Sequence, residues 1–98
     1  MPFRLVFTPE AVSALEALEG DGHQEKKLKK VRRALGRLQQ DPKHPGLSSH
    51  KYMSLSGVNG EAVWDSYVEN NTPSAWRIFW HYGPDDGAIT VLAITSKD

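Results

Sequence analysis

The stretch TPSAWRIFWHYG, residues 72–83, alternates large apolar side chains with residues of mixed character. In a β-strand, successive side chains point to opposite faces of the sheet. One face of this strand would therefore carry a set of side chains suited to a core: Trp76, Ile78, Trp80 and Tyr82. The other face would carry an unusual mixture of cationic and aromatic side chains: Arg77, Phe79 and His81. The stretch predicts a strand over 75–82 with one packed face and one face built around an arginine.

The first half of the chain predicts a strand followed by two helices. PFRLVF (2–7) alternates as a short strand, and Thr8-Pro9-Glu10 is typical of a helix start, with a threonine cap and a proline in the first turn. This helix should end at Gly20. A second helix is expected over 23–40, because apolar residues recur there at helical spacing: Leu28, Val31, Leu35 and Leu38.

The second half predicts a sheet. Residues 62–69 and 75–82 alternate as strands, and the β-branched run over 88–95 should form a central strand. Residues 51–55 are extended and form a possible further short strand. The expected fold is α+β with the order β-α-α-β-β-β, in which both helices cover one face of the sheet and the other face stays open.

Composition limits the classes of protein to consider. The chain has 98 residues, which we interpret as one domain over 1–98, and its 39% hydrophobic content is ordinary for a globular protein. It contains no cysteine, which excludes disulfides and thiolate metal sites and fits a reducing cytoplasm. No apolar run reaches the ~20 residues of a membrane span. The four histidines (23, 44, 50 and 81) have no metal-ligand spacing, so we expect no metal and no cofactor.

Charge is segregated along the chain although the formal net charge is zero. Residues 26–37 contain seven bases and no acid. Four of these bases share one stripe of the second helix, with Lys29 beside it: Lys26, Lys30, Arg33 and Arg37. Such a stripe is either a solvated helix face or a surface for a nucleic-acid backbone. The absence of acids among the bases favours nucleic acid.

Arg77 has two interpretations. An arginine held within a strand can clamp a phosphate or stabilise the charge that develops in phosphoryl transfer. It can also pair across strands with Asp65 or Glu69, which alternate with Tyr67 on one face of the preceding strand. If that is the open face, Tyr67, Glu69, Arg77 and His81 converge as possible acid, base and clamp.

The ordered set of features resembles the RelE/ParE-like toxins of bacterial toxin–antitoxin systems. The resemblance rests on the element order, the lysine-rich second helix and three segments: DPKHPGLSSHKY (41–52), AWRIFWHYG (75–83) and ITVLAIT (89–95). It covers nearly the whole chain and is closest to a cytotoxin branch with YVENNTPSAWRIFWHYG (67–83).

The resemblance implies a metal-independent endoribonuclease that cleaves mRNA on the open face, often on the ribosome, and that is held by a cognate antitoxin. Arg77 maps onto the family's arginine on this strand, and Glu69 or His81 would carry the proton, with Tyr67 nearby. The expected RNA-contacting residues are Lys26, Lys29, Lys30, Arg33, Arg37, His50, Lys51 and Phe79.

Two other functions remain open at this point. AVWDSYVE (62–69) carries acids where RelE carries catalytic lysines. A ParE-type protein would instead inhibit a protein target such as DNA gyrase without being an enzyme, and a degenerate member would only bind a partner. The sequence carries no signal for a particular oligomeric state.

Overall fold

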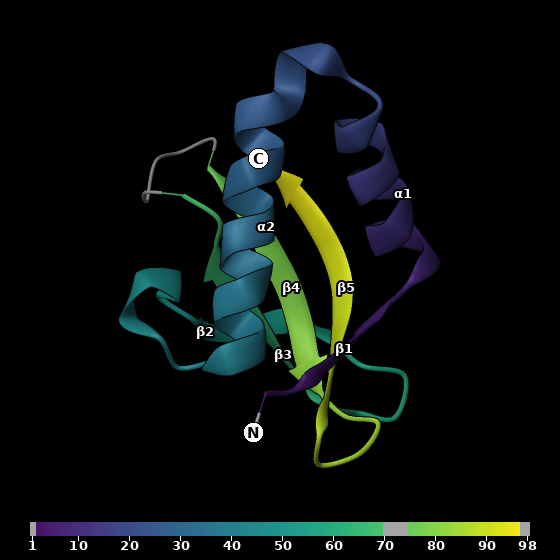
Figure 1. Ribbon diagram of the computed structural model, residues 1–98. Coiled ribbons are helices and arrows are strands. Elements are labelled where there is room, and N and C mark those ends of the chain that lie inside the picture. Colours follow the sequence, from purple (N-terminus) through teal and green to yellow (C-terminus); the bar gives the residue numbers. More distant parts are fainter. Residues whose placement is uncertain (1, 70–74, 97–98) are drawn as a thin grey trace.

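The structure is a computed structural model that describes residues 2–69 and 75–96 (Figure 1). Its main elements are β1 (Arg4–Phe7), α1 (Pro9–Glu19), α2 (Glu25–Gln40), β2 (His50–Ser56), β3 (Ala62–Tyr67), β4 (Trp76–Tyr82) and β5 (Ala88–Ser96). Short 3-10 turns, η1 (Gly22–Gln24) and η2 (Pro45–Leu47), precede and follow α2. The predicted α+β class and element order are confirmed, and the possible further strand is β2.

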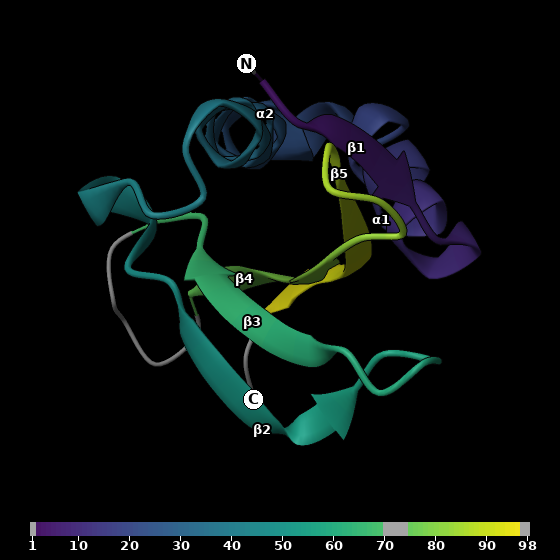
Figure 2. The same ribbon diagram turned by 90° about the horizontal axis from the view of Figure 1, so that it is seen from below.

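The strands form a five-stranded sheet in the order β1-β5-β4-β3-β2. β1 pairs with β5 in parallel, and the other neighbours are antiparallel. As predicted, β5 lies inside the sheet. Both helices cover the same face (Figure 2). In the described part of the chain, no helix lies on the other face of the sheet, so the layer arrangement expected from the sequence is confirmed.

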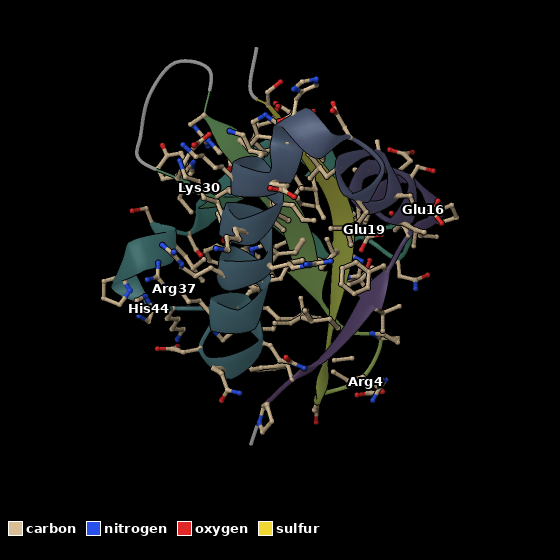
Figure 3. All side chains as sticks on the ribbon, turned by 45° about the horizontal axis from the view of Figure 1, so that its top comes forward. Arg4, Glu16, Glu19, Lys30, Arg37 and His44 are labelled. Atoms are coloured by element: carbon tan, nitrogen blue, oxygen red, sulfur yellow. The ribbon has the colours of Figure 1, made fainter. Side chains whose placement is uncertain are left out.

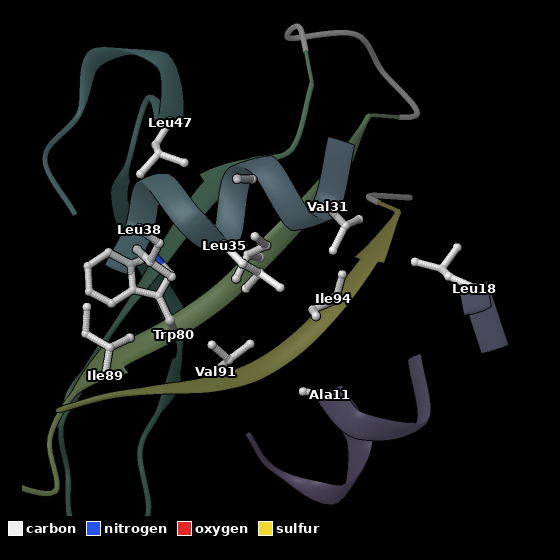
Figure 4. Close-up of a cluster of buried hydrophobic side chains, with 12 residues drawn as sticks. Ala11, Leu18, Val31, Leu35, Leu38, Leu47, Trp80, Ile89, Val91 and Ile94 are labelled. Atoms are coloured by element: carbon white, nitrogen blue, oxygen red, sulfur yellow. The ribbon is translucent and has the colours of Figure 1, made fainter. Parts of the chain in front are cut away.

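The core lies between the helices and the sheet (Figure 4). From α2 it receives Val31, Ala34, Leu35 and Leu38, which follow the predicted apolar seam. From the sheet it receives Ile78 and Trp80 of β4, as their alternation predicted, together with Ile89, Val91 and Ile94 of β5.

An irregularity in β5 decides which of its side chains reach this core. Phe79 pairs with Ala93 and Trp80 pairs with Val91, so Leu92 is an additional residue on β5. Because side chains alternate, Val91 and Ile94 would point to opposite faces of a regular strand. The bulge reverses the alternation between them, so that both are buried against the helices.

Thr8 joins the start of α1 to this bulge. Its side chain accepts a hydrogen bond from the Ala11 N–H at 3.2 Å, which caps the helix, and its hydroxyl donates to the Leu92 carbonyl at 2.8 Å. A bulge disrupts the regular ladder of backbone hydrogen bonds, so the Leu92 carbonyl gains a partner from outside the sheet. One side chain therefore supports both the helix cap and the bulge.

We expect Thr8→Ala to lower the free energy of unfolding by about 1–2 kcal/mol, because it removes the cap and the partner of Leu92 together. Thr8→Ser keeps the hydroxyl and should retain most of this stability. Urea unfolding of both variants measures the difference, and a Thr8→Ala protein as stable as the wild type would contradict this role.

Candidate functional site

The sheet face opposite the helices carries the residues that the sequence grouped around Arg77. Strand register places Tyr67 of β3 opposite Arg77 of β4, and Asp65 opposite Phe79. β2 adds His50 opposite Asp65. Side chains of directly paired residues share a face, so these three strands bring their polar groups together on the uncovered side of the sheet.

Arg77 forms a buried ion pair with Asp65. The Arg77 Nη1 donates to Asp65 Oδ2 at 2.5 Å, and the two residues are only 2% and 1% exposed. The cross-strand pairing interpretation of Arg77 is therefore confirmed, with Asp65 as the partner. Asp65 Oδ1 and Arg77 Nε have no hydrogen-bond partner among the described residues. The pair is thus not fully satisfied, and each charge depends on the other for compensation.

Aromatic side chains enclose this pair. The Arg77 guanidinium lies 3.9 Å from the centroid of the Tyr67 ring, a cation–π contact. Phe79 lies on the same face, and its ring meets that of Tyr52 edge-on at 4.9 Å between centroids. Tyr52 was not among the predicted site residues, although its position two residues after His50 puts it on the same face of β2.

His50 is the exposed polar group beside the buried pair. Its Nδ1 lies 3.1 Å from the Ser48 carbonyl, and its Nε2 lies 3.5 Å from Asp65 Oδ2. A carbonyl only accepts, so Nδ1 carries a proton in this contact. The Nε2 then faces the Asp65 carboxylate, and half of the His50 side chain is exposed.

His81 lies on the same face but farther along β4. Four residues separate it from Arg77, which corresponds to about 13 Å along a strand. His81 is buried, and its Nδ1 donates to the Tyr82 carbonyl at 2.8 Å. It lies near Glu61, whose pKa is lowered mainly by backbone hydrogen bonds from Glu61 and Asn59 and to a lesser extent by His81. The predicted convergence of His81 with Arg77 is not observed.

Glu69 also departs from the predicted arrangement. It follows the end of β3, and its carboxylate accepts hydrogen bonds from Lys27 and Lys30 of α2 instead of facing Arg77. The hydrogen bond from Lys27, with a further one from Lys30, lowers the pKa of Glu69 below its usual 4.5. The expectation that Glu69 lies on the open face is wrong, because the alternation of β3 ends at Tyr67.

The basic residues separate into two groups. The predicted stripe on α2 is exposed at all its positions, with Lys29 beside it: Lys26, Lys30, Arg33 and Arg37. Lys30 and Arg37 are seen on α2 in Figure 3, whereas Glu16 and Glu19 lie on α1. Lys51 does not join His50, since it pairs with Trp64 on the helix side, where its Nζ is 5.9 Å from the Trp64 ring centroid.

No helix in the described part of the chain is both long and apolar enough to span a membrane. The described residues also contain no group of three or more histidine, aspartate or glutamate side chains that could hold a metal ion.

We expect Arg77→Ala to lower the free energy of unfolding by about 3–5 kcal/mol, because it leaves the Asp65 carboxylate buried without a partner. The matched control is the double variant Asp65→Leu with Arg77→Met, which removes both charges and should recover most of the loss. Urea unfolding of the single and double variants provides the comparison. If Arg77→Ala matched the wild type, the pair would contribute nothing to stability.

Acidic pH should remove the contribution of Glu69 to the free energy of unfolding. Because its pKa is lowered in the folded state, the stabilisation is present above the unfolded pKa near 4.5 and is lost as the pH falls through the folded pKa. Glu69→Gln should therefore reduce stability by about 1 kcal/mol at pH 7, and the difference from the wild type should disappear at low pH. Unfolding curves at both pH values test this, and a difference that is independent of pH would contradict it.

Comparison with solved structures finds the same fold along nearly the whole chain. The YoeB/ParE toxin from Agrobacterium tumefaciens gives a TM-score of 0.72 at 12% identity, covering 98% of this chain and 100% of that one. A chain of the RelE–RelB complex from Pyrococcus horikoshii OT3 gives 0.68 at 15% identity, covering 99% and 97%. A chain of the YoeB–YefM complex from Staphylococcus aureus gives 0.64 at 16% identity, covering 97% of both.

No protein-family model matches the sequence, and no curated protein matches it. At the identities found among the solved structures, the likeness is one of fold. The predicted resemblance is confirmed at that level: the chain has the fold of the RelE, YoeB and ParE toxins.

Proposed function

We propose that the chain is a RelE/ParE-like toxin that acts on RNA or on the ribosome and is held inactive by a cognate antitoxin. The observation that carries this proposal is an exposed basic face of α2 on a toxin-type fold. The likeness to toxin structures supports the toxin role over nearly the whole chain, and the basic face supports RNA as the target.

The positive charge of α2 is only partly neutralised by the protein itself. Lys27 and Lys30 pair with Glu69, and Arg32 pairs with Glu19. The remaining bases on the helix have no carboxylate partner within residues 2–69 and 75–96: Lys26, Lys29, Arg33 and Arg37. α2 has 16 residues, about 24 Å of helix, along which these cations can meet successive phosphates of an RNA strand.

We infer an antitoxin partner because some of the similar structures were solved as complexes with a second protein. Chains of this fold were solved as a RelE–RelB complex and as a YoeB–YefM complex. A toxin that acted on the RNA of its own cell would need such a partner to be silent. We expect the antitoxin to cover α2 or the sheet face around Arg77.

Cleavage of RNA would use the sheet face around Arg77. The 2′-hydroxyl of a ribose would attack the adjacent 3′-phosphate and expel the 5′-oxygen of the next nucleotide, which leaves a 2′,3′-cyclic phosphate and a 5′-hydroxyl. Arg77 would stabilise the charge that develops on the phosphate. The phosphate would have to displace Asp65 from Arg77, since the guanidinium is buried in that pair. His50 is exposed beside the pair and is a more accessible proton carrier than Glu69, which is engaged by lysines.

A non-enzymatic inhibitor is the second candidate, and the same ion pair favours it. An arginine already paired with a buried carboxylate is not free to clamp a phosphate, and the strand before it carries Asp65 in place of a cation. Such a protein would act by binding a protein target such as DNA gyrase, or by binding only its partner.

Induced expression of the chain in bacteria should stop growth, with fragments of mRNA appearing within minutes. Sequencing of RNA ends after induction tests this directly. Intact mRNA together with trapped, cleaved DNA would support the gyrase candidate instead, and normal growth would overturn the toxin assignment.

Reversing the charge at Lys26, Lys29 and Arg33 to glutamate should weaken binding to RNA or ribosomes by at least tenfold and reduce its salt dependence, without unfolding the domain. These three residues are chosen because they are exposed and make no ion pair in the described part of the chain. The control adds acids on α1, at the exposed positions Ser13 and Ala17, and should bind as the wild type does. The control changes the net charge by about −2 and the reversal by about −6, so a loss of binding free energy in the control about one third of that in the reversal would show only an effect of net charge.

A further inference from the structure

A cavity of about 540 Å³ opens on the helix side of the sheet, beyond the C-terminal end of α2. It lies on the opposite face of the sheet from Arg77. The loop that follows α2 forms one wall, and β3 and β4 form the other. The lining is mostly apolar and consists of Pro42, Lys43, His44, Pro45, Ser48, Ser49, Trp64, Trp80 and Tyr82.

Three aromatic rings form the sheet wall of this cavity. Trp64 and Trp80 stack with 6.0 Å between centroids and 19° between planes. Tyr82 stands nearly perpendicular to Trp80, at 5.0 Å and 83°, and is 39% exposed. Trp80 is held in place because its Nε1–H donates to Ser66 Oγ at 2.8 Å. Trp80 is itself only 1% exposed, so a group in the cavity would contact the partly exposed rings of Trp64 and Tyr82.

One cation lines the cavity, and two more lie close to residues that form it. Lys43 is exposed and belongs to its lining, and the Nζ of Lys51 lies over the ring of Trp64. Arg37, the last member of the α2 stripe, lies close to the same loop. A Cβ atom built on Gly46 would lie only 3.0 Å from Arg37 Nη1. Figure 3 shows Arg37 and His44 close together at this end of α2.

One carboxylate lies near these cations. Asp41 accepts a hydrogen bond from the Lys43 backbone N–H at 3.0 Å. Burial, with a smaller effect of the Asp41 charge, raises the pKa of Tyr82, so its phenol stays protonated and can donate.

The loop that forms the cavity also holds the candidate site on the other face. Ser48 adopts a left-handed conformation with φ of 45°, which is uncommon for a residue other than glycine. Its carbonyl accepts from His50 Nδ1, and Ser49 is hydrogen-bonded to Ser66 within the sheet. The short segment 48–50 therefore passes from the cavity wall to the edge of the Arg77 site.

We propose that this cavity binds a base of single-stranded RNA against Trp64 and Tyr82, while Lys43 and Arg37 contact the flanking phosphates. The inference rests on the proposed RNA-directed function and adds a site for one nucleotide. Aromatic rings that stack on bases, bordered by cations that follow the backbone, are the means by which proteins bind single strands.

The position of the cavity favours RNA over a protein segment as its occupant. The exposed cations of α2 lead along the helix to Arg37, and the cavity begins two residues after the helix ends, at Pro42. An RNA strand whose phosphates contact the cations of α2 in order would therefore reach the aromatic side chains of the cavity. A base in a duplex is already stacked and paired, so the occupant must be unpaired.

Binding of two hexamers to the wild-type chain tests the inference: hexauridylate, and a hexamer with the same phosphates but no bases. Trp64 lines the cavity and is partly exposed, so hexauridylate should quench tryptophan fluorescence, whereas the abasic hexamer should not. The abasic hexamer should also bind roughly 5- to 150-fold more weakly, as expected for loss of one stacked base.

Two variants separate stacking from charge. Tyr82→Ala should weaken binding of hexauridylate at least fivefold without changing the salt dependence, whereas Tyr82→Phe should bind as the wild type does. Lys43→Ala should reduce the slope of log affinity against log salt by about 0.7, the value for one phosphate on a single strand. Arg4→Ala, a change to an exposed cation at another part of the surface, is the control and should have no effect. Unfolding curves establish that each variant is folded.

The outcomes distinguish this inference from the function on which it rests. If hexauridylate binding is lost on charge reversal of α2 but unchanged in Tyr82→Ala and Lys43→Ala, the cavity site is refuted and the RNA-directed function stands. If the wild type binds neither RNA nor ribosomes, both are refuted. A Tyr82→Ala protein that binds RNA normally but fails to bind its antitoxin would show that a protein segment occupies the cavity.

Discussion

The buried ion pair between Arg77 and Asp65 constrains the whole sheet. Within residues 2–69 and 75–96, neither charge has another partner of opposite sign that is equally buried, so β3 and β4 must keep the register that joins them. In that register, Trp64 lies opposite Trp80 on the helix side. A slip by one residue would turn Arg77 towards the apolar core and Trp80 away from it, which is costly on both faces. The polar pair and the hydrophobic core thus specify the same arrangement of strands.

The two faces of the sheet have different chemistry as a result. The helix side is filled by apolar side chains from α2 and β5 and leaves an aromatic corner where α2 ends. The uncovered side is polar near Arg77 but is closed by Tyr67, so that the guanidinium is not accessible from solvent. Exposed cations lie along α2 instead. An RNA-directed toxin of this design would first bind through the helix, and any chemistry at Arg77 would require exchange of Asp65 for a phosphate.

Much of the fold was determined by local patterns in the sequence. The alternation over 75–82 identified the core side chains Ile78 and Trp80, and the helical spacing of Val31, Leu35 and Leu38 identified the buried seam of α2. Thr8 and Pro9 marked the start of α1 through the cap that they form. These predictions succeeded because capping and face alternation depend on neighbours within a few residues. The exposed stripe on α2 followed from the same periodicity.

Tertiary structure decided the features that depend on contacts between distant segments. Glu69 forms ion pairs with Lys27 and Lys30. Because β3 ends at Tyr67, the simple alternation of a strand predicted the wrong face for the Glu69 side chain. The bulge at Leu92 likewise reverses the faces of β5 within one apolar run. The sequence allowed Arg77 to pair with either Asp65 or Glu69, and only strand register selected Asp65. The aromatic cavity is formed by residues from the α2–β2 loop, β3 and β4, which are far apart in the chain and meet only when the sheet is assembled.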